Sequence, residues 1–128
     1  MLSLGHNQIV VVPDDVGVLT RLRDLDLSHN ALVDLPDSVG ALVSLTSLNV
    51  RANRLRLVPE VMARLTRLQR LVLSENLLQG LPSNLGLGMA ELRHLAVDCN
   101  RLESLPHGIV QCTRLQVRGR ERHPTKSE

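Results

Sequence analysis

The pattern L-x-x-L-x-L-x-x-N, first complete at Leu22–Asn30, recurs through nearly the whole chain. Its closing asparagines lie 23, 23, 23 and 24 residues apart, at Asn7, Asn30, Asn53, Asn76 and Asn100. Prolines keep step with them, at Pro13, Pro36, Pro59, Pro82 and Pro106. One fixed period of this length predicts a solenoid, in which successive coils stack and share a core.

The leucines of the pattern alternate with outward residues, which predicts a short strand in every repeat. In Leu25-Asp26-Leu27 the two leucines face one side and Asp26 faces the other. Stacked copies would pair about 4.8 Å apart in a parallel sheet. Each closing asparagine is expected on the buried side, where its amide needs backbone partners in its own turn and in the next coil. We therefore predict a structural asparagine ladder.

The second half of each repeat predicts a short helical return. Proline is favoured at the first helical position, and an acid follows directly at Asp14, Asp37 and Glu60, where negative charge favours a helix N-terminus. Val39 and Leu42 would share one apolar face of such a helix. Small residues predict close packing beneath it, at Gly17, Gly40, Ala63 and Gly86. Gly86-Leu87-Gly88 carries one extra residue, which we expect to form a bulge.

This combination resembles the leucine-rich repeat family in the form L-x-x-L-x-L-x-x-N-x-L-x-x-L-P-x-x-[IV]-G-x-L-x-x. The resemblance implies an α/β solenoid with a curved parallel sheet on its concave side and short helices or turns on its convex side. About five repeats, near 1–21, 22–44, 45–67, 68–91 and 92–114, would form one domain over residues 1–117. The L-P-x-x-[IV]-G spacing is similar to intracellular proteins of the Scribble/Erbin, Ras-suppressor and plant Ras-group-related kinds.

The two ends of the repeat array depart from the pattern. Leu2 already belongs to a strand, with no polar capping segment before it, and after Leu115 the pattern stops because Arg118 stands where the next strand leucine belongs. We predict that residues 118–128 form a disordered basic tail and that both ends of the solenoid are open. The chain would then be a fragment or an isoform without caps.

Charge is distributed unevenly along the chain. Residues 1–50 hold six acids and two arginines, a net −4, and residues 51–128 hold thirteen bases and seven acids, a net +6, which together give the formal +2. An acidic first coil and a basic last coil predict head-to-tail self-association, a contact that need not close.

Composition argues against several other classes of protein. The chain has no Phe, Tyr or Trp, which excludes base stacking on aromatic rings. The tail arginines and Lys126 could touch phosphates, but Glu121 interrupts them, so we predict no nucleic-acid partner. No apolar run approaches 18 residues, so no membrane span is expected. Two cysteines make no disulfide framework, which favours a reducing, cytoplasmic setting.

The concave strand face is the surface that solenoids commonly offer to partners. Its outward positions run from acidic, through polar and Arg, to a small apolar patch, and a partner with the opposite order of charge would be steered to it. The alternative for any one of these residues is plain solvated surface. We predict partner-binding roles for Asp24, Asp26, Asn49, Arg51, Arg70, Val72 and His94.

Metal binding and catalysis are the sharper alternatives, and the sequence favours neither. His6 and His29 occupy the same position in adjacent coils, but a closed zinc site takes four ligands and two exposed imidazoles are the better interpretation. Cys99 shares its coil with His94 and Asp98, a combination that would suit a nucleophile, yet nothing encloses them. Cys112 is read as a buried substitute for leucine. We predict no metal, cofactor or enzymatic activity.

The resemblance implies a non-catalytic protein-interaction module or signalling scaffold. The alternative is a substrate- or regulator-recognition fragment of a larger multidomain enzyme, such as a kinase, ubiquitin ligase or phosphatase, because such repeats are fused to these enzymes. Sequence on either side of residues 1–128 would discriminate between the two.

Overall fold

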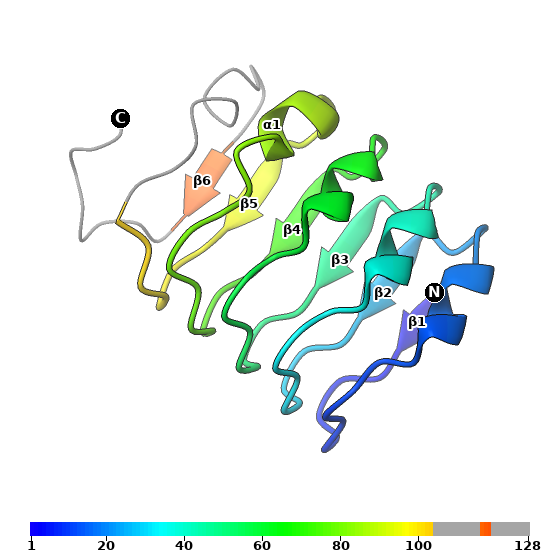
Figure 1. Ribbon diagram of the computed structural model, residues 1–128, viewed down its shortest axis with the longest axis horizontal. Coiled ribbons are helices and arrows are strands. Elements are labelled where there is room, and N and C mark those ends of the chain that lie inside the picture. The colour runs from blue at the N-terminus through cyan, green and yellow to red at the C-terminus, as the bar shows by residue number, and fades with distance from the viewer. Residues whose placement is uncertain (104–115, 119–128) are drawn as a thin grey trace.

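The computed structural model describes residues 1–103 and 116–118, which wind into a solenoid with one six-stranded parallel sheet. The strands follow each other across the sheet in chain order (Figure 1). They are β1 Leu2–Ser3, β2 Asp24–Asp26, β3 Ser47–Asn49, β4 Arg70–Val72, β5 His94–Ala96 and β6 Gln116–Arg118. The predicted α/β solenoid is confirmed.

Identical repeats place identical residues side by side across the sheet. Leu25 pairs with Leu48, Leu48 with Leu71, and Leu71 with Leu95. All four leucines are at most 1% exposed, so one continuous apolar row lies between the sheet and the return segments. Since each coil buries its leucines mainly against its neighbours, the solenoid is stabilised by stacking rather than within single coils.

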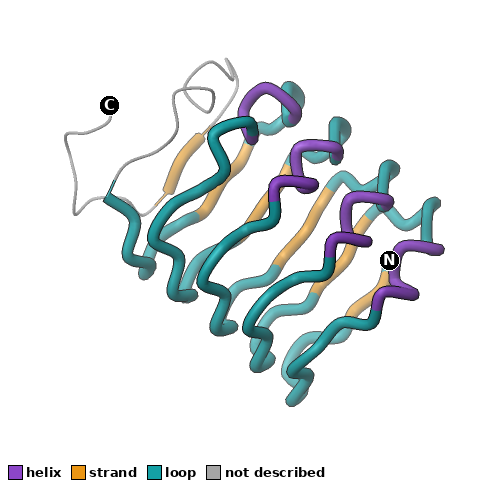
Figure 2. The backbone as a smooth tube through the Cα atoms, viewed as in Figure 1, coloured by secondary structure: helices purple, strands orange, loops and turns teal. Residues whose placement is uncertain are grey.

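The return segments of the first three coils are 3-10 helices, which lie opposite the strands in Figure 2. They are η1 Asp14–Val18, η2 Asp37–Ala41 and η3 Glu60–Arg64, each directly after an extended proline. Their hydrogen bonds span three residues, as from Val16 N–H to Pro13 O at 3.1 Å. Each buries one apolar side chain at its centre, the predicted Val39 in η2.

The extra residue of the fourth coil is taken up by a change of helix type, so the expected bulge was wrong. The return segment is an α-helical turn, α1 Leu85–Gly88. Gly88 N–H bonds Asn84 O at 3.2 Å and Met89 N–H bonds Leu85 O at 3.0 Å, both across four residues. An α turn takes 3.6 residues where a 3-10 turn takes three, which accommodates the insertion. A Cβ added at Gly88 would lie 1.9 Å from Ala63 O.

The sheet continues further than the repeat pattern indicated. β6 pairs with β5 and sets Val117, not Arg118, in register with Leu95. The spacing from Leu95 to Val117 is 117 − 95 = 22 residues, so counting 23 from Leu95 placed the strand leucine at the wrong position. Arg118, predicted to begin the tail, pairs with Ala96. Pro106, Cys112 and the rest of the tail, 119–128, lie outside the described residues, and the domain boundary stays a prediction.

Within the described part of the chain, no helix has the length and hydrophobicity required to cross a membrane.

Candidate functional site

The asparagine ladder joins each coil to the coil before it. Asn53 Nδ2 donates to Val50 O in its own coil and to Leu27 O in the preceding coil, both at 3.0 Å. Its Oδ1 accepts from Leu32 N–H of that preceding coil at 3.0 Å. The expectation of partners in the next coil therefore had the direction reversed. The same set of bonds recurs at Asn30, Asn76 and Asn100.

Asn7 is the exception in the ladder. Its amide donates to Leu4 O at 2.9 Å and Gly5 O at 3.1 Å, both within its own coil, and its side chain is exposed. The reason is topological, because β1 is the edge strand of the described sheet and offers Asn7 no earlier coil to bond.

A left-handed residue precedes every ladder asparagine and turns the chain out of its strand. Residues with φ near +60° cost roughly 1–2 kcal/mol in this conformation unless they are glycine. None of the five here is glycine, so the turn depends on the fixed bonds of the asparagine that follows. They are His6 at 59°, His29 at 58°, Ala52 at 61°, Glu75 at 61° and Cys99 at 59°.

The acidic end of the concave face is built around Asp26. Its carboxylate Oδ1 accepts from Ser28 Oγ at 2.6 Å and from Ser28 N–H at 2.9 Å. Partial burial alone would raise the pKa of Asp26, but the two Ser28 bonds and the charges of His6 and His29 outweigh it and lower that pKa. Asp26 is therefore a carboxylate held in one orientation at neutral pH.

His6 and His29 stack beside this carboxylate, with ring centroids 4.3 Å apart and ring planes 9° from parallel. Ring nitrogens bind metals in the plane of the ring, so two parallel stacked rings do not converge on one ion. No group of three or more His, Cys, Asp or Glu residues in the described chain is arranged to hold a metal. The two histidines are thus rim residues of a polar surface.

The centre of the concave face carries an ion pair between two coils. Arg51 Nε donates to Glu75 Oε2 at 2.8 Å, and the second guanidinium nitrogen reaches the same oxygen. The hydrogen bond and charge of Glu75 raise the pKa of Arg51 further above its ordinary value. Both side chains remain well exposed, at 49% and 38%. Asn49 Oδ1 accepts from Arg51 N–H at 3.0 Å, which brings two of the predicted residues together.

The other predicted residues divide into two rows. Asp24, Arg70 and His94 share one register row across the sheet, with Ser47 between the first two. Arg70 is exposed, while Asp24 and His94 are half-buried. Val72 lies in the next row between Asn49 and Ala96, but it is only 6% exposed and offers a partner little surface.

Cys99 does not have the surroundings of a nucleophile. Its thiol is exposed, and its sulfur lies 3.9 Å from Asp98 Oδ2. A neighbouring carboxylate disfavours the thiolate that nucleophilic chemistry needs. Asp98 in turn accepts a hydrogen bond from the Ser74 hydroxyl of the preceding coil. Cys99 and Asp98 thus form part of the polar surface.

Reasoning from sequence missed the partners that order this face, namely Ser28, Glu75 and the Ser74–Asp98 pair. A usable signal was present. Arg51 and Glu75 are 24 residues apart, so a search for opposite charges at nearly one repeat spacing would have found them.

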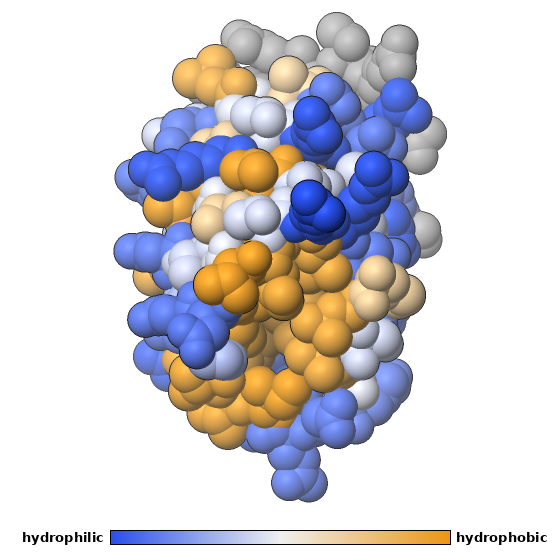
Figure 3. Space-filling view, turned by 90° about the vertical axis from the view of Figure 1, so that its right-hand side faces the viewer, coloured by the Kyte–Doolittle hydropathy of each residue, from blue (hydrophilic) through white to orange (hydrophobic). Residues whose placement is uncertain are grey.

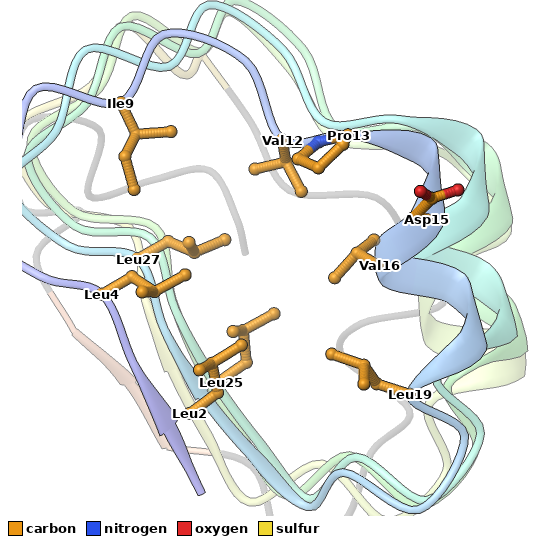
Figure 4. A pocket seen from close by; sticks show the side chains of 10 residues that line it. All are labelled: Leu2, Leu4, Ile9, Val12, Pro13, Asp15, Val16, Leu19, Leu25 and Leu27. Atoms are coloured by element: carbon orange, nitrogen blue, oxygen red, sulfur yellow. The ribbon is translucent and has the colours of Figure 1, made fainter.

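A second feature is an apolar hollow at the end of the solenoid where β1 lies. Figure 3 looks onto this end and shows apolar residues around the hollow, with hydrophilic residues outside them. Its volume is about 270 Å³. The lining residues converge on it from the strands and from η1 in Figure 4: Leu2, Leu4, Ile9, Val12, Pro13, Asp15, Val16, Leu19, Leu25 and Leu27.

Comparison with known proteins agrees with this geometry. A family model described as leucine rich repeat matches residues 1–55. The solved structure of a leucine-rich repeat protein from Leptospira interrogans matches with a TM-score of 0.69 and 25% identity over 92% of this chain. The chain has the leucine-rich repeat fold. Both matches support a leucine-rich repeat family.

The same comparisons limit what can be transferred to this leucine-rich repeat solenoid. It spans 42% of the length of the Leptospira interrogans chain. No curated protein matches it significantly in sequence.

Proposed function

We propose that this leucine-rich repeat solenoid is a non-catalytic protein-interaction module that binds a protein partner through its concave face. The observation that carries the proposal is the ordered row of charged groups there, with the Asp26–Ser28 cluster at one end and the Arg51–Glu75 pair at the centre. Leucine-rich repeat proteins generally act in protein–protein interaction. The resemblance to intracellular scaffolds supports a scaffolding role in cytoplasmic signalling.

Arg70 is the residue best suited to anchor the partner. It is exposed beside the Arg51–Glu75 pair, and it forms no salt bridge with another described residue. Arginine is enriched among residues that dominate binding energy. Arg51 is already held in place by Glu75, so less side-chain entropy is lost when a partner carboxylate joins the pair. The partner surface would be acidic opposite Arg70 and basic opposite Asp24 and Asp26.

Charge reversal on the two faces of the solenoid tests this proposal. The variant Arg51→Glu/Arg70→Glu is compared with Arg64→Glu/Arg67→Glu, which makes the same charge change at exposed positions outside the strand face. Affinity capture from cells with quantitative mass spectrometry should show partners lost at least tenfold with the first variant and retained with the second. Partners retained by both variants, or lost equally by both, would refute concave-face binding.

A second candidate function rests on length. Because the chain spans 42% of the Leptospira interrogans structure, these repeats also fit the recognition segment of a longer protein, including a multidomain enzyme. The intact mass of the endogenous protein, after antibody capture, decides between the two. A mass near 14.2 kDa supports a free-standing module, and a larger mass supports a recognition segment.

A further inference from the structure

The first coil leaves apolar side chains exposed that every later coil covers. Leu19 is 39% exposed, although the residues at its position in the next two coils, Leu42 and Leu65, are fully buried. Ile9 is half-buried where its equivalent Leu32 is 0% exposed. The apolar hollow is therefore the contact surface between two coils with one partner missing, and not an irregularity of packing.

The hydrogen bonds between coils specify what fits there. Asp26 O accepts from Leu4 N–H at 2.8 Å, and the next two coils repeat this bond with Asn49 O and Val72 O as acceptors at 2.8 and 2.9 Å. Ser3 pairs with Asp26, so its carbonyl holds the same position at the open edge of β1. The occupant is thus a polypeptide strand that runs parallel to β1 and carries an apolar side chain facing the hollow.

Two observations favour a second copy of this chain, placed head to tail. At the other end of the described sheet, β6 is an edge strand with the same direction as β1, so stacking β6 of one copy on β1 of another continues the parallel sheet. In addition, residues 1–50 carry a net −4 and residues 51–128 a net +6, so these ends attract. A head-to-head pair would instead bring the acidic Asp14 and Asp15 of two copies together.

We propose that the apolar hollow beside β1 is a docking site for the β6 end of a second copy. In this arrangement Val117 of one copy joins the buried leucine row next to Leu2 of the other, as the register of β5 with β6 indicates. The contact is heterologous, so it propagates into open chains of molecules rather than closing into a dimer. This proposal is independent of the concave-face function.

Sedimentation velocity over a hundredfold concentration range tests the association. The wild-type chain should grow from 14.2 kDa through successive multiples, without a final size. Leu19→Glu places a charge at the mouth of the hollow and should raise the dissociation constant at least tenfold. Val43→Glu, at a 51% exposed position in the second coil, is the matched control and should leave association unchanged. A wild-type monomer at all concentrations, or equal association of Leu19→Glu, would overturn the proposal.

Disulfide trapping tests the direction, with Cys99 and Cys112 replaced by Ser and folding checked by circular dichroism. Arg118 of one copy should lie opposite Ser3 of the next, at the spacing of adjacent strands. Mixed Ser3→Cys and Arg118→Cys single variants should therefore form a covalent heterodimer on oxidation. A Ser3→Cys homodimer would show head-to-head docking and refute the arrangement, as would the absence of any crosslink.

Discussion

At the scale of single residues, the ladder asparagines hold the solenoid together by bonding main-chain groups of two coils at once. Asn53 is 8% exposed and bonds Leu27 O, Val50 O and Leu32 N–H, whereas Asn7 bonds its own coil alone. Substitution by Ala removes the side-chain partners and leaves buried backbone groups unsatisfied. The same substitution should therefore have unequal effects along the ladder.

We expect Asn53→Ala to lower the free energy of unfolding by about 2–3 kcal/mol and Asn7→Ala by less than about 1 kcal/mol. Urea denaturation followed by circular dichroism measures both, at a protein concentration below self-association. Equal losses at the two positions would mean that the bonds between coils contribute nothing beyond the turn itself.

The lowered pKa of Asp26 predicts a contribution to stability that depends on pH. Because folding depresses the pKa below the model value of 3.8, the contribution is present above that pH and is lost as pH falls through the folded-state pKa. Asp26→Asn should lose stability at pH 7 and show a smaller loss between pH 7 and pH 3 than the wild type. Asp24→Asn makes the same charge change two residues earlier, and its pH dependence should stay close to that of the wild type.

Sequence reasoning located the ladder because a period of 23 repeats every position that carries it. It could not find the left-handed turn before each asparagine, since His, Ala, Glu and Cys occupy that position and no glycine marks it. It also mistook an outward position for an exposed one. Val72 points away from the leucine row, yet it is nearly covered in the finished sheet.

At the scale of elements, one inserted residue converts a 3-10 return into the α turn α1. The prediction of a short helix in each repeat needed only the proline and the apolar spacing. The choice of helix type depends on how the turn fits against its neighbour, which no single repeat contains. Gly88 shows this, because its closest contact is Ala63 O in the preceding coil.

This close approach predicts that Gly88→Ala lowers the free energy of unfolding by at least about 2 kcal/mol, since the added methyl group meets a backbone oxygen. Gly80 is the matched control, with no atom within 4 Å of an added Cβ. Gly80→Ala should be within about 1 kcal/mol of the wild type or slightly stabilising. Thermal unfolding of the two variants side by side measures the difference.

At the scale of the whole molecule, nearest-neighbour stacking makes stability vary along the solenoid. Leu4 N–H and Val50 N–H make equivalent bonds between coils, at 2.8 Å to Asp26 O and 2.9 Å to Val72 O. Leu4 belongs to the first coil, which has a neighbour on one side, and Val50 belongs to the third, which has two.

Amide hydrogen exchange should therefore be at least about tenfold faster at Leu4 than at Val50, because opening an end coil breaks one stacked contact where opening a central coil breaks two. Nuclear magnetic resonance at low protein concentration gives both rates. Raising the concentration should slow Leu4 selectively if second copies cover the first coil. Equal rates would indicate that the solenoid opens as one unit.

The asparagine ladder also determines how the molecule would respond to a mechanical load. Each ladder amide from Asn30 to Asn100 ties one coil to the coil before it, so a pull applied to the two ends loads these connections in series. The weakest junction gives way first, and each rupture releases one repeat of chain. At roughly 3.3–3.6 Å per extended residue, a released coil lengthens the tether by about 80 Å, so the protein would yield stepwise under tension.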